Sequence, residues 1–153
     1  MLMIKSVILT FLMAMVPVIE LRGAIPFGVV QGLSVPTAFA VSIIGNLLPI
    51  PILVIFTRKV FEWLRTKSRW LDSMVVKLEA KADKNRDLVE KYQFWGLMIL
   101  VAIPLPGTGA WTGALVAAMM DMRLKRAMPA IIVGVLVAGI IVTGITYGVG
   151  ALF

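Results

Sequence analysis

The sequence lacks cysteine and histidine and has little negative charge. Its 153 residues include no Cys, no His and only eight Asp and Glu. Without Cys and His, the chain cannot form disulfides, use thiol nucleophiles or imidazole catalysis, or build the usual zinc, haem and iron–sulfur sites. No Gly-x-Ser-x-Gly, Walker A or Gly-x-Gly-x-x-Gly motif is present. We therefore expect no catalytic residues, no cofactor and no metal site.

Charge of either sign is scarce and unevenly distributed. Charged residues make up 15% of the chain, hydrophobic residues 60%, and the mean hydropathy is +0.99. Soluble domains carry about 25% charged residues, and one core of this size could not bury so much apolar surface. Residues 24–57, 92–120 and 127–153 contain no charge, whereas 58–91 holds ten of the fifteen basic residues. This pattern predicts an integral membrane protein.

The net charge of +7 suits either a nucleic acid or a membrane surface. The basic residues flank apolar stretches, where anionic lipid headgroups are the expected partner. We therefore expect the lipid bilayer as the partner and no nucleic acid, and we expect a multi-pass protein of the cell (plasma) membrane.

Two apolar stretches are long enough to cross a bilayer, and two are interrupted. A spanning helix needs about 20 apolar residues, which residues 36–57 and 127–150 supply. Two charged residues interrupt 6–33, and a turn rich in Pro and Gly interrupts 92–121. Proline removes a backbone donor and glycine loosens the chain. Neither interrupted stretch is expected to form one straight helix.

Two topologies fit these stretches. Each interrupted stretch either crosses once, which gives four ordinary spans, or forms a re-entrant helical hairpin. Four spans would place 58–91 and 123–126 on opposite sides of the membrane, which the positive-inside rule disfavours. Hairpins place both basic segments in the cytoplasm and both termini outside, with Lys5 as the exception. We favour the hairpin topology.

This topology divides the chain into two halves of opposite orientation. Residues 1–57 form the first repeat and 92–153 the second, each with one hairpin and one spanning helix. Small residues recur in the same order in the two hairpins: Ala24, Gly28 and Gly32, then Gly109, Gly113 and Ala117. Inverted repeats with broken helices that meet near the midplane are a known transporter design. The predicted fold is therefore all-α, with two inverted repeats.

Residues 58–91 are predicted to be an amphipathic cytoplasmic linker between the repeats. Apolar residues recur at helical spacing at Leu71, Met74, Val75, Leu78 and Ala82. Trp63 and Trp70 are typical of a membrane interface. Lys81–Asp87 is polar and is predicted to be a solvated turn.

Glu20 and Arg22 are the candidate substrate and proton-coupling residues. A charge at the bilayer centre costs roughly 2.5–3.5 kcal/mol on insertion scales, so such residues usually face a cavity or a protein interior. Residues two apart do not face each other on a regular helix. We expect an unwound turn, with Gly23 and Pro26 nearby, that lets both point into one cavity. The alternative is that both lie among the headgroups and only mark the end of a span.

The matching turn of the second hairpin is the candidate gate. Backbone amides at the start of a half-helix can bind an anion or a polar group. The hydroxyls of Thr108 and Thr112 add hydrogen-bond donors. The alternative is a plain interfacial turn. The candidate residues are Pro104, Pro106, Gly107, Thr108, Gly109 and Thr112. Asn46, beside Pro49 in an apolar span, is a candidate polar contact, although satisfying the backbone at the kink is its more expected role.

The segments Glu20–Pro26 and Pro104–Gly113 resemble those of the small multidrug export protein family, and the likeness covers essentially the whole chain. More distantly, the layout is similar to the DedA superfamily, which has two facing hairpins and is linked to lipid-carrier movement. That resemblance implies that Glu20 is the acidic residue of the first hairpin. The second hairpin departs from the DedA pattern, because it has Thr108 and Trp111 where an Arg is usual.

These observations lead to a hypothesis of a proton-coupled secondary transporter. Its cargo would be an amphiphile, either a lipophilic drug or a lipid-linked phosphate. One chain of 153 residues is small for enclosing a transport path, so we expect that a homodimer would help to enclose it. The alternative function is a membrane structural or assembly factor with interfacial hairpins, and an intramembrane enzyme ranks third because no nucleophile pair is present.

Overall fold

The computed structural model describes residues 1–83, 92–105 and 108–148, and the regular structure in these residues is helical throughout. This confirms the predicted all-α class. The helices are α1 (Leu2–Met15), α2 (Glu20–Val30), α3 (Val35–Leu47), α4 (Ile50–Lys67), α5 (Arg69–Asp83), α7 (Gln93–Ala102), α8 (Ala110–Met119) and α9 (Leu124–Tyr147).

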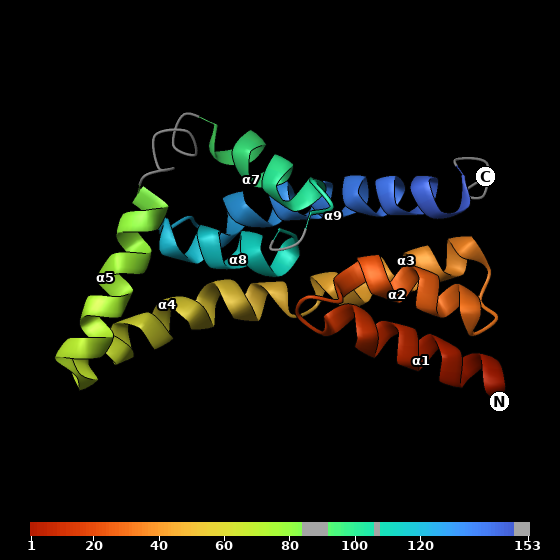
Figure 1. Cartoon of the computed structure of the whole chain (residues 1–153), viewed down its shortest axis with the longest axis horizontal. Coiled ribbons are helices and arrows are strands. Elements are labelled where there is room, and N and C mark those ends of the chain that lie inside the picture. Colours follow the sequence, from red (N-terminus) through yellow and green to blue (C-terminus); the bar gives the residue numbers. More distant parts are fainter. Residues whose placement is uncertain (84–91, 106–107, 149–153) are drawn as a thin grey trace.

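The first two helices form an antiparallel hairpin that packs on α3 (Figure 1). α2 ends at Val30, and the turn that follows contains Gly32, whose φ of +91° is easily reached only by glycine. The N–H of Leu33 donates to Gly28 O at 3.0 Å. Ser34 then caps α3 by accepting a hydrogen bond from the N–H of Thr37. The chain therefore reverses sharply twice within its first 35 residues.

The apolar stretch predicted as one spanning helix over 36–57 is divided into α3 and α4. The two helices meet at Leu48–Pro49, because Pro49 and Pro51 have no N–H to donate to the preceding turn. α4 then continues to Lys67, beyond the boundary predicted at residue 57. The charged segment is thus a direct extension of the apolar helix.

The charged segment forms a second helix after a break at Ser68. Ser68 has extended backbone angles, φ −160° and ψ 140°, and α5 begins at the next residue. The predicted amphipathic stripe lies on α5. The prediction of a turn from Lys81 is wrong for residues 81–83, because these residues belong to α5. The physical reason is that Lys and Ala favour helix. The rest of the predicted turn, 84–87, lies outside the described residues.

The second half begins with α7 and α8, which run in opposite directions, and ends with the long α9. α7 packs along α9, whereas α8 packs mainly against α4. α9 begins at Leu124, slightly earlier than the predicted span. The second hairpin therefore contacts helices from both halves of the chain.

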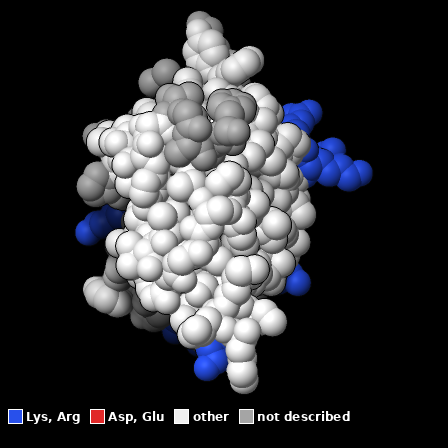
Figure 2. Space-filling view, turned by 90° about the vertical axis from the view of Figure 1, so that its right-hand side faces the viewer, with Lys and Arg blue, Asp and Glu red and all other residues white. Residues whose placement is uncertain are grey.

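The two ends of the elongated molecule differ in charge. Both the N-terminus and the last turn of α9 lie at one end in Figure 1, and α5 lies at the other. Viewed from the terminal end, the described surface shows no acidic side chain, and basic ones appear only at its edge (Figure 2). The charged helix α5 and the terminal end are thus on opposite sides of the apolar body.

The long helices carry apolar side chains that the protein does not cover. The combined α3–α4 segment, Val35–Lys67, and α9, Leu124–Tyr147, are long and apolar enough to cross a membrane, and only 33% and 39% of their most apolar windows are buried. On α9 the exposed side chains include Ile132, Leu136 and Ile140. So large an exposed apolar surface requires a lipid or protein neighbour, in agreement with the predicted membrane protein.

Glycines allow the same close helix contacts in both halves. Gly45 of α3 lies against the carbonyl oxygen of Phe11 in α1, and Gly134 of α9 lies against that of Met98 in α7. Within the hairpins, Gly28 packs on Thr10 and Gly113 packs on Val101. A Cβ atom at any of these four glycines would lie within 3 Å of a neighbouring atom. Each half is therefore held by backbone-to-backbone approach.

Candidate functional site

The turns of the two hairpins meet near the centre of the molecule (Figure 1). The first turn, Val16–Ile19, joins α1 to α2, and the second joins α7 to α8. Val18 and Glu20 have φ values of +78° and +48°, a region that L side chains rarely adopt. Such strained positions are held by their surroundings and cluster at functional sites.

Glu20 binds the beginning of α8. Its side chain is 4% exposed, and Oε1 accepts a hydrogen bond from the N–H of Trp111 at 3.1 Å. The first amides of a helix lack intrahelical acceptors and carry partial positive charge. The residue before α8 is Gly109, which has no side chain to cap the helix. Glu20 therefore supplies, from the other hairpin, the cap that α8 lacks.

Gly109 makes room for this carboxylate. Its φ of +118° and ψ of −171° lie in a region that is essentially restricted to glycine. A Cβ atom at this position would collide with both carboxylate oxygens of Glu20. The glycine is therefore required both by the backbone conformation and by the close approach of Glu20.

Arg22 binds the end of α7. Nη2 donates to Ile103 O at 3.2 Å and to Thr108 Oγ1 at 2.8 Å, and Nη1 donates to Leu105 O. The last carbonyls of a helix carry partial negative charge, which a cation stabilises. Glu20 thus meets the positive N-terminus of α8, whereas Arg22 meets carbonyl oxygens of the C-cap residue of α7, Ile103, and of the turn that follows it.

Trp111 makes the return contact from the second hairpin. Its indole Nε1 donates to the carbonyl oxygen of Met15, the last residue of α1, at 3.2 Å. Its own backbone N–H is the donor to Glu20. We call this set of residues the hairpin junction: Met15, Glu20, Arg22, Ile103, Leu105, Thr108, Gly109 and Trp111.

The structure changes the expected setting of the two charged residues. They were predicted to lie in an unwound turn, but α2 begins at Glu20 and its backbone bonds are regular from there: the N–H of Gly23 donates to Ile19 O at 3.1 Å. The positive φ of Glu20 directs its side chain away from the course of α2 and toward the second hairpin. The long side chain of Arg22 also reaches the second hairpin. They bind hairpin groups rather than each other.

The other candidates are distributed around the junction. Thr108 lies within it, and its hydroxyl accepts from the N–H of Leu105 at 3.2 Å. Gly23 and Pro26 lie within α2, and Thr112 is half-buried on α8. Pro104 is half-buried in the second turn. Pro106 and Gly107 lie outside the described residues.

Asn46 does not have the role expected for it. Its side chain is fully buried, and neither the amide nitrogen nor the oxygen has a partner among the described residues. The backbone crosses the α3–α4 break without it, because the N–H of Leu48 donates to Ile44 O at 3.1 Å and that of Leu53 to Pro49 O at 2.9 Å. The kink therefore leaves this amide with unused hydrogen-bonding capacity.

Trp111 is not among the site residues that the sequence predicts. An indole N–H in an apolar segment needs a partner, and this signal alone could have marked it. Its partner is a backbone atom 96 positions away in the chain, which no local pattern predicts.

The contacts of the hairpin junction are hydrogen bonds between side chains of one hairpin and groups of the other. Its two charged side chains, Glu20 and Arg22, are held in this way, and such contacts can form and break without breaking a covalent bond. No group of three or more carboxylates that could hold a metal occurs within residues 1–83, 92–105 and 108–148.

Comparison with known families gives one match. The model of the family described as "Putative small multi-drug export protein" matches residues 20–141, which include the second hairpin turn and every residue of the hairpin junction except Met15. The first turn, Val16–Ile19, directly precedes the matched residues. Neither a curated protein nor a solved structure matches the chain.

Proposed function

Since the chain belongs to the small multi-drug export protein family, we propose that it is a secondary membrane transporter of small amphiphilic compounds. The cargo passes between the two hairpins, and the hairpin junction is its gate. The observation that carries the proposal is the reciprocal binding of Glu20 and Arg22 to the ends of α8 and α7.

The lengths of the hairpin arms support a re-entrant placement. The arms α1, α2, α7 and α8 have 14, 11, 10 and 10 residues, which gives lengths of about 15–21 Å at 1.5 Å per residue. A hydrocarbon core is about 30 Å thick. Each arm reaches about the middle of the membrane, and the two turns meet there.

The glycine contacts support two related halves. Gly45 and Gly134 place the third helix of each half against the backbone of the first hairpin arm.

The end that bears α5 lies opposite the end that bears the N-terminus (Figure 1). In the proposed topology the first is cytoplasmic and the second is outside, and the second repeat is inverted relative to the first.

The gate opens when its charges change. Glu20 is the coupling-proton site: protonation removes the negative charge that holds the N-terminus of α8. Loss of this contact lets the hairpins separate, and Arg22 then exchanges the carbonyls of α7 for a polar group of the cargo. Both steps use residues whose partners are backbone atoms and the hydroxyl of Thr108, so neither requires a second titrating side chain.

Transport in proteoliposomes with an imposed pH gradient tests the proposal. The parent protein is expected to move a lipophilic cationic dye, and Glu20→Gln is expected to abolish the dependence of transport on the gradient. Arg22→Ala is expected to lower the rate at least tenfold. Arg69→Gln on α5 is the matched control and should transport as the parent does.

Two outcomes would favour the structural or assembly function instead. One is unchanged transport by Glu20→Gln and Arg22→Ala variants that express and elute normally. The other comes from cysteine scanning, which the absence of native Cys makes direct. Single cysteines at 20–24 and 106–110 should react with membrane-impermeant thiol reagents if the gate opens to water, and complete protection from both sides would contradict a transport path.

A further inference from the structure

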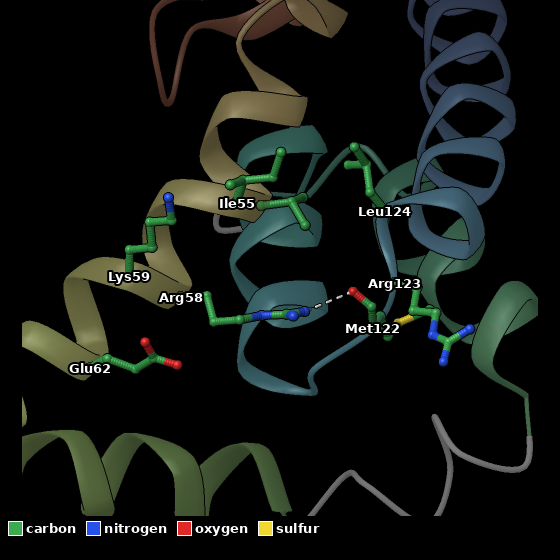
Figure 3. Close-up of a pocket in the computed structure, with 8 residues that line it drawn as sticks. Ile55, Arg58, Lys59, Glu62, Met122, Arg123 and Leu124 are labelled. Carbon is green, nitrogen blue, oxygen red and sulfur yellow. Dashed lines mark hydrogen bonds between the residues drawn. The ribbon is translucent and has the colours of Figure 1, made fainter.

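A pocket with basic and apolar walls lies between α4 and the loop that joins α8 to α9, away from the hairpin junction. Its volume is about 450 Å³. Figure 3 shows Ile55, Lys59 and Glu62 on the α4 side and Arg123 and Leu124 on the other side. Three of the lining side chains are basic and one is acidic, so an anion is the ligand that its charge favours.

Arg58 fixes the two walls of this pocket. Its Nη2 donates to Met122 O at 3.0 Å, the bond drawn in Figure 3, and its Nε lies 3.1 Å from Asp121 Oδ1. The guanidinium therefore joins α4 to the α8–α9 loop and sets the width of the pocket. The other two lining cations, Lys59 and Arg123, are exposed at its rim.

The start of α9 adds to the positive potential. No side chain caps this helix, and no acidic residue lies in its first turn. Instead the first turn and the preceding residue contain Arg123, Lys125 and Arg126. Cations at a helix N-terminus are unfavourable, because they face the positive end of the helix dipole. A bound anion would remove this repulsion.

The position along α4 indicates where the anion comes from. The turn before the pocket exposes the large apolar side chains of Ile52, Ile55 and Phe56, and the first charged residues of α4 follow at Arg58 and Lys59. A change from exposed apolar to basic residues within one helix is typical of the membrane–water interface. The pocket therefore lies at the depth of lipid headgroups.

We infer that this pocket binds the phosphate of an anionic phospholipid, with Lys59 on one wall and Arg123 on the other as the basic residues that attract it, and the acyl chains along the apolar face of α4. The site does not depend on transport. It places a lipid between the two halves of the chain, at the point where Arg58 joins them.

Calorimetric titration of the detergent-solubilised protein with short-chain phosphatidylglycerol tests the inference. The double variant Lys59→Gln/Arg123→Gln is expected to bind about tenfold more weakly, since each basic residue near a lipid surface contributes a several-fold change in affinity. Both residues are exposed, so the fold should not change, which circular dichroism checks. Arg58 is left intact because it holds the walls together.

Matched variants make the test specific. Arg69→Gln/Lys77→Gln removes the same charge from exposed positions on α5 and should leave the affinity within twofold. Glu62→Gln removes the acidic lining residue and should strengthen binding several-fold. Phosphatidylcholine of the same chain length should bind no better to the parent than to the double variant.

Two results would overturn the inference. Equal losses in the Lys59/Arg123 and Arg69/Lys77 pairs would mean that phosphatidylglycerol responds only to overall charge. Inorganic phosphate that competes as well as the lipid would mean that a free anion, not a lipid, is the ligand.

Discussion

The two hairpins have the same architecture but contribute different chemistry to their junction. Both consist of short antiparallel helices held by glycine contacts at Gly28 and Gly113. The first hairpin supplies charged side chains, Glu20 and Arg22, whereas the second supplies mainly backbone groups: the N–H of Trp111 and the carbonyls of Ile103 and Leu105.

This difference shows how one hairpin can recognise another without matching charges. The ends of α7 and α8 already carry partial charges of opposite sign, so the second hairpin needs no ionised residue. It needs only a backbone that exposes its helix ends. We therefore expect the most damaging substitutions in the first hairpin to be those that remove a charged side chain. In the second hairpin we expect them to be those that change the backbone conformation.

The largest effect is expected at Gly109. Gly109→Ala should lower the free energy of unfolding by about 3 kcal/mol, because the new Cβ meets the carboxylate of Glu20 and the backbone conformation is nearly restricted to glycine. Denaturant titration in mixed micelles would measure it. In a Glu20→Ala background the cost should fall to the backbone part alone. An equal cost in both backgrounds would show that the collision is unimportant.

The next largest effect compares the two halves directly. Gly45→Ala and Gly134→Ala should each cost about 2 kcal/mol, since both place a Cβ against a carbonyl oxygen of the first hairpin arm. Thermal unfolding in detergent would compare them. At Gly148 a new Cβ would meet no atom of the described residues within 4 Å other than those of its chain neighbours, so Gly148→Ala should cost only the backbone part, about 1 kcal/mol. A large cost at one glycine and none at the other would show that the two halves are not held by equivalent contacts.

Arg22→Lys tests the fork-shaped contact with the end of α7. Lysine retains the charge but cannot reach two carbonyls and a hydroxyl in one plane, so we expect a loss of about 1.5 kcal/mol. Hydrogen exchange at the last turn of α7 should rise with it. Arg69→Lys on α5 serves as the control, and the same change in both variants would argue against a specific role for the guanidinium.

The smallest effect is expected at Trp111. Trp111→Phe retains an aromatic ring but removes the hydrogen bond to Met15 O, which should cost about 1 kcal/mol. Chemical unfolding of this variant should be compared with Trp95→Phe, which changes an exposed tryptophan. If the two substitutions have equal effects, the indole contact does not help to hold the hairpins together.

Composition and charge spacing predicted much of the fold, because segments that cross a lipid bilayer must be apolar. The all-α class follows from such patterns, and they also single out Glu20 and Arg22, which the structure places at the contact between the hairpins. A kink beside Pro49 was expected, but the division of the stretch into two helices was not, since the apolar residues continue through it without interruption. The contacts of Trp111 could not be predicted either, because their partners lie in a distant turn.

The partners of Glu20 and Arg22 have a consequence for how the chain tolerates change. A backbone amide or carbonyl is present whatever side chain occupies its position, so substitution at Ile103 or Leu105 cannot remove the acceptor that Arg22 uses. The second hairpin can vary in side-chain character at these positions and still be recognised. Random mutagenesis should therefore recover many functional variants at Ile103 and Leu105 and almost none at Gly109.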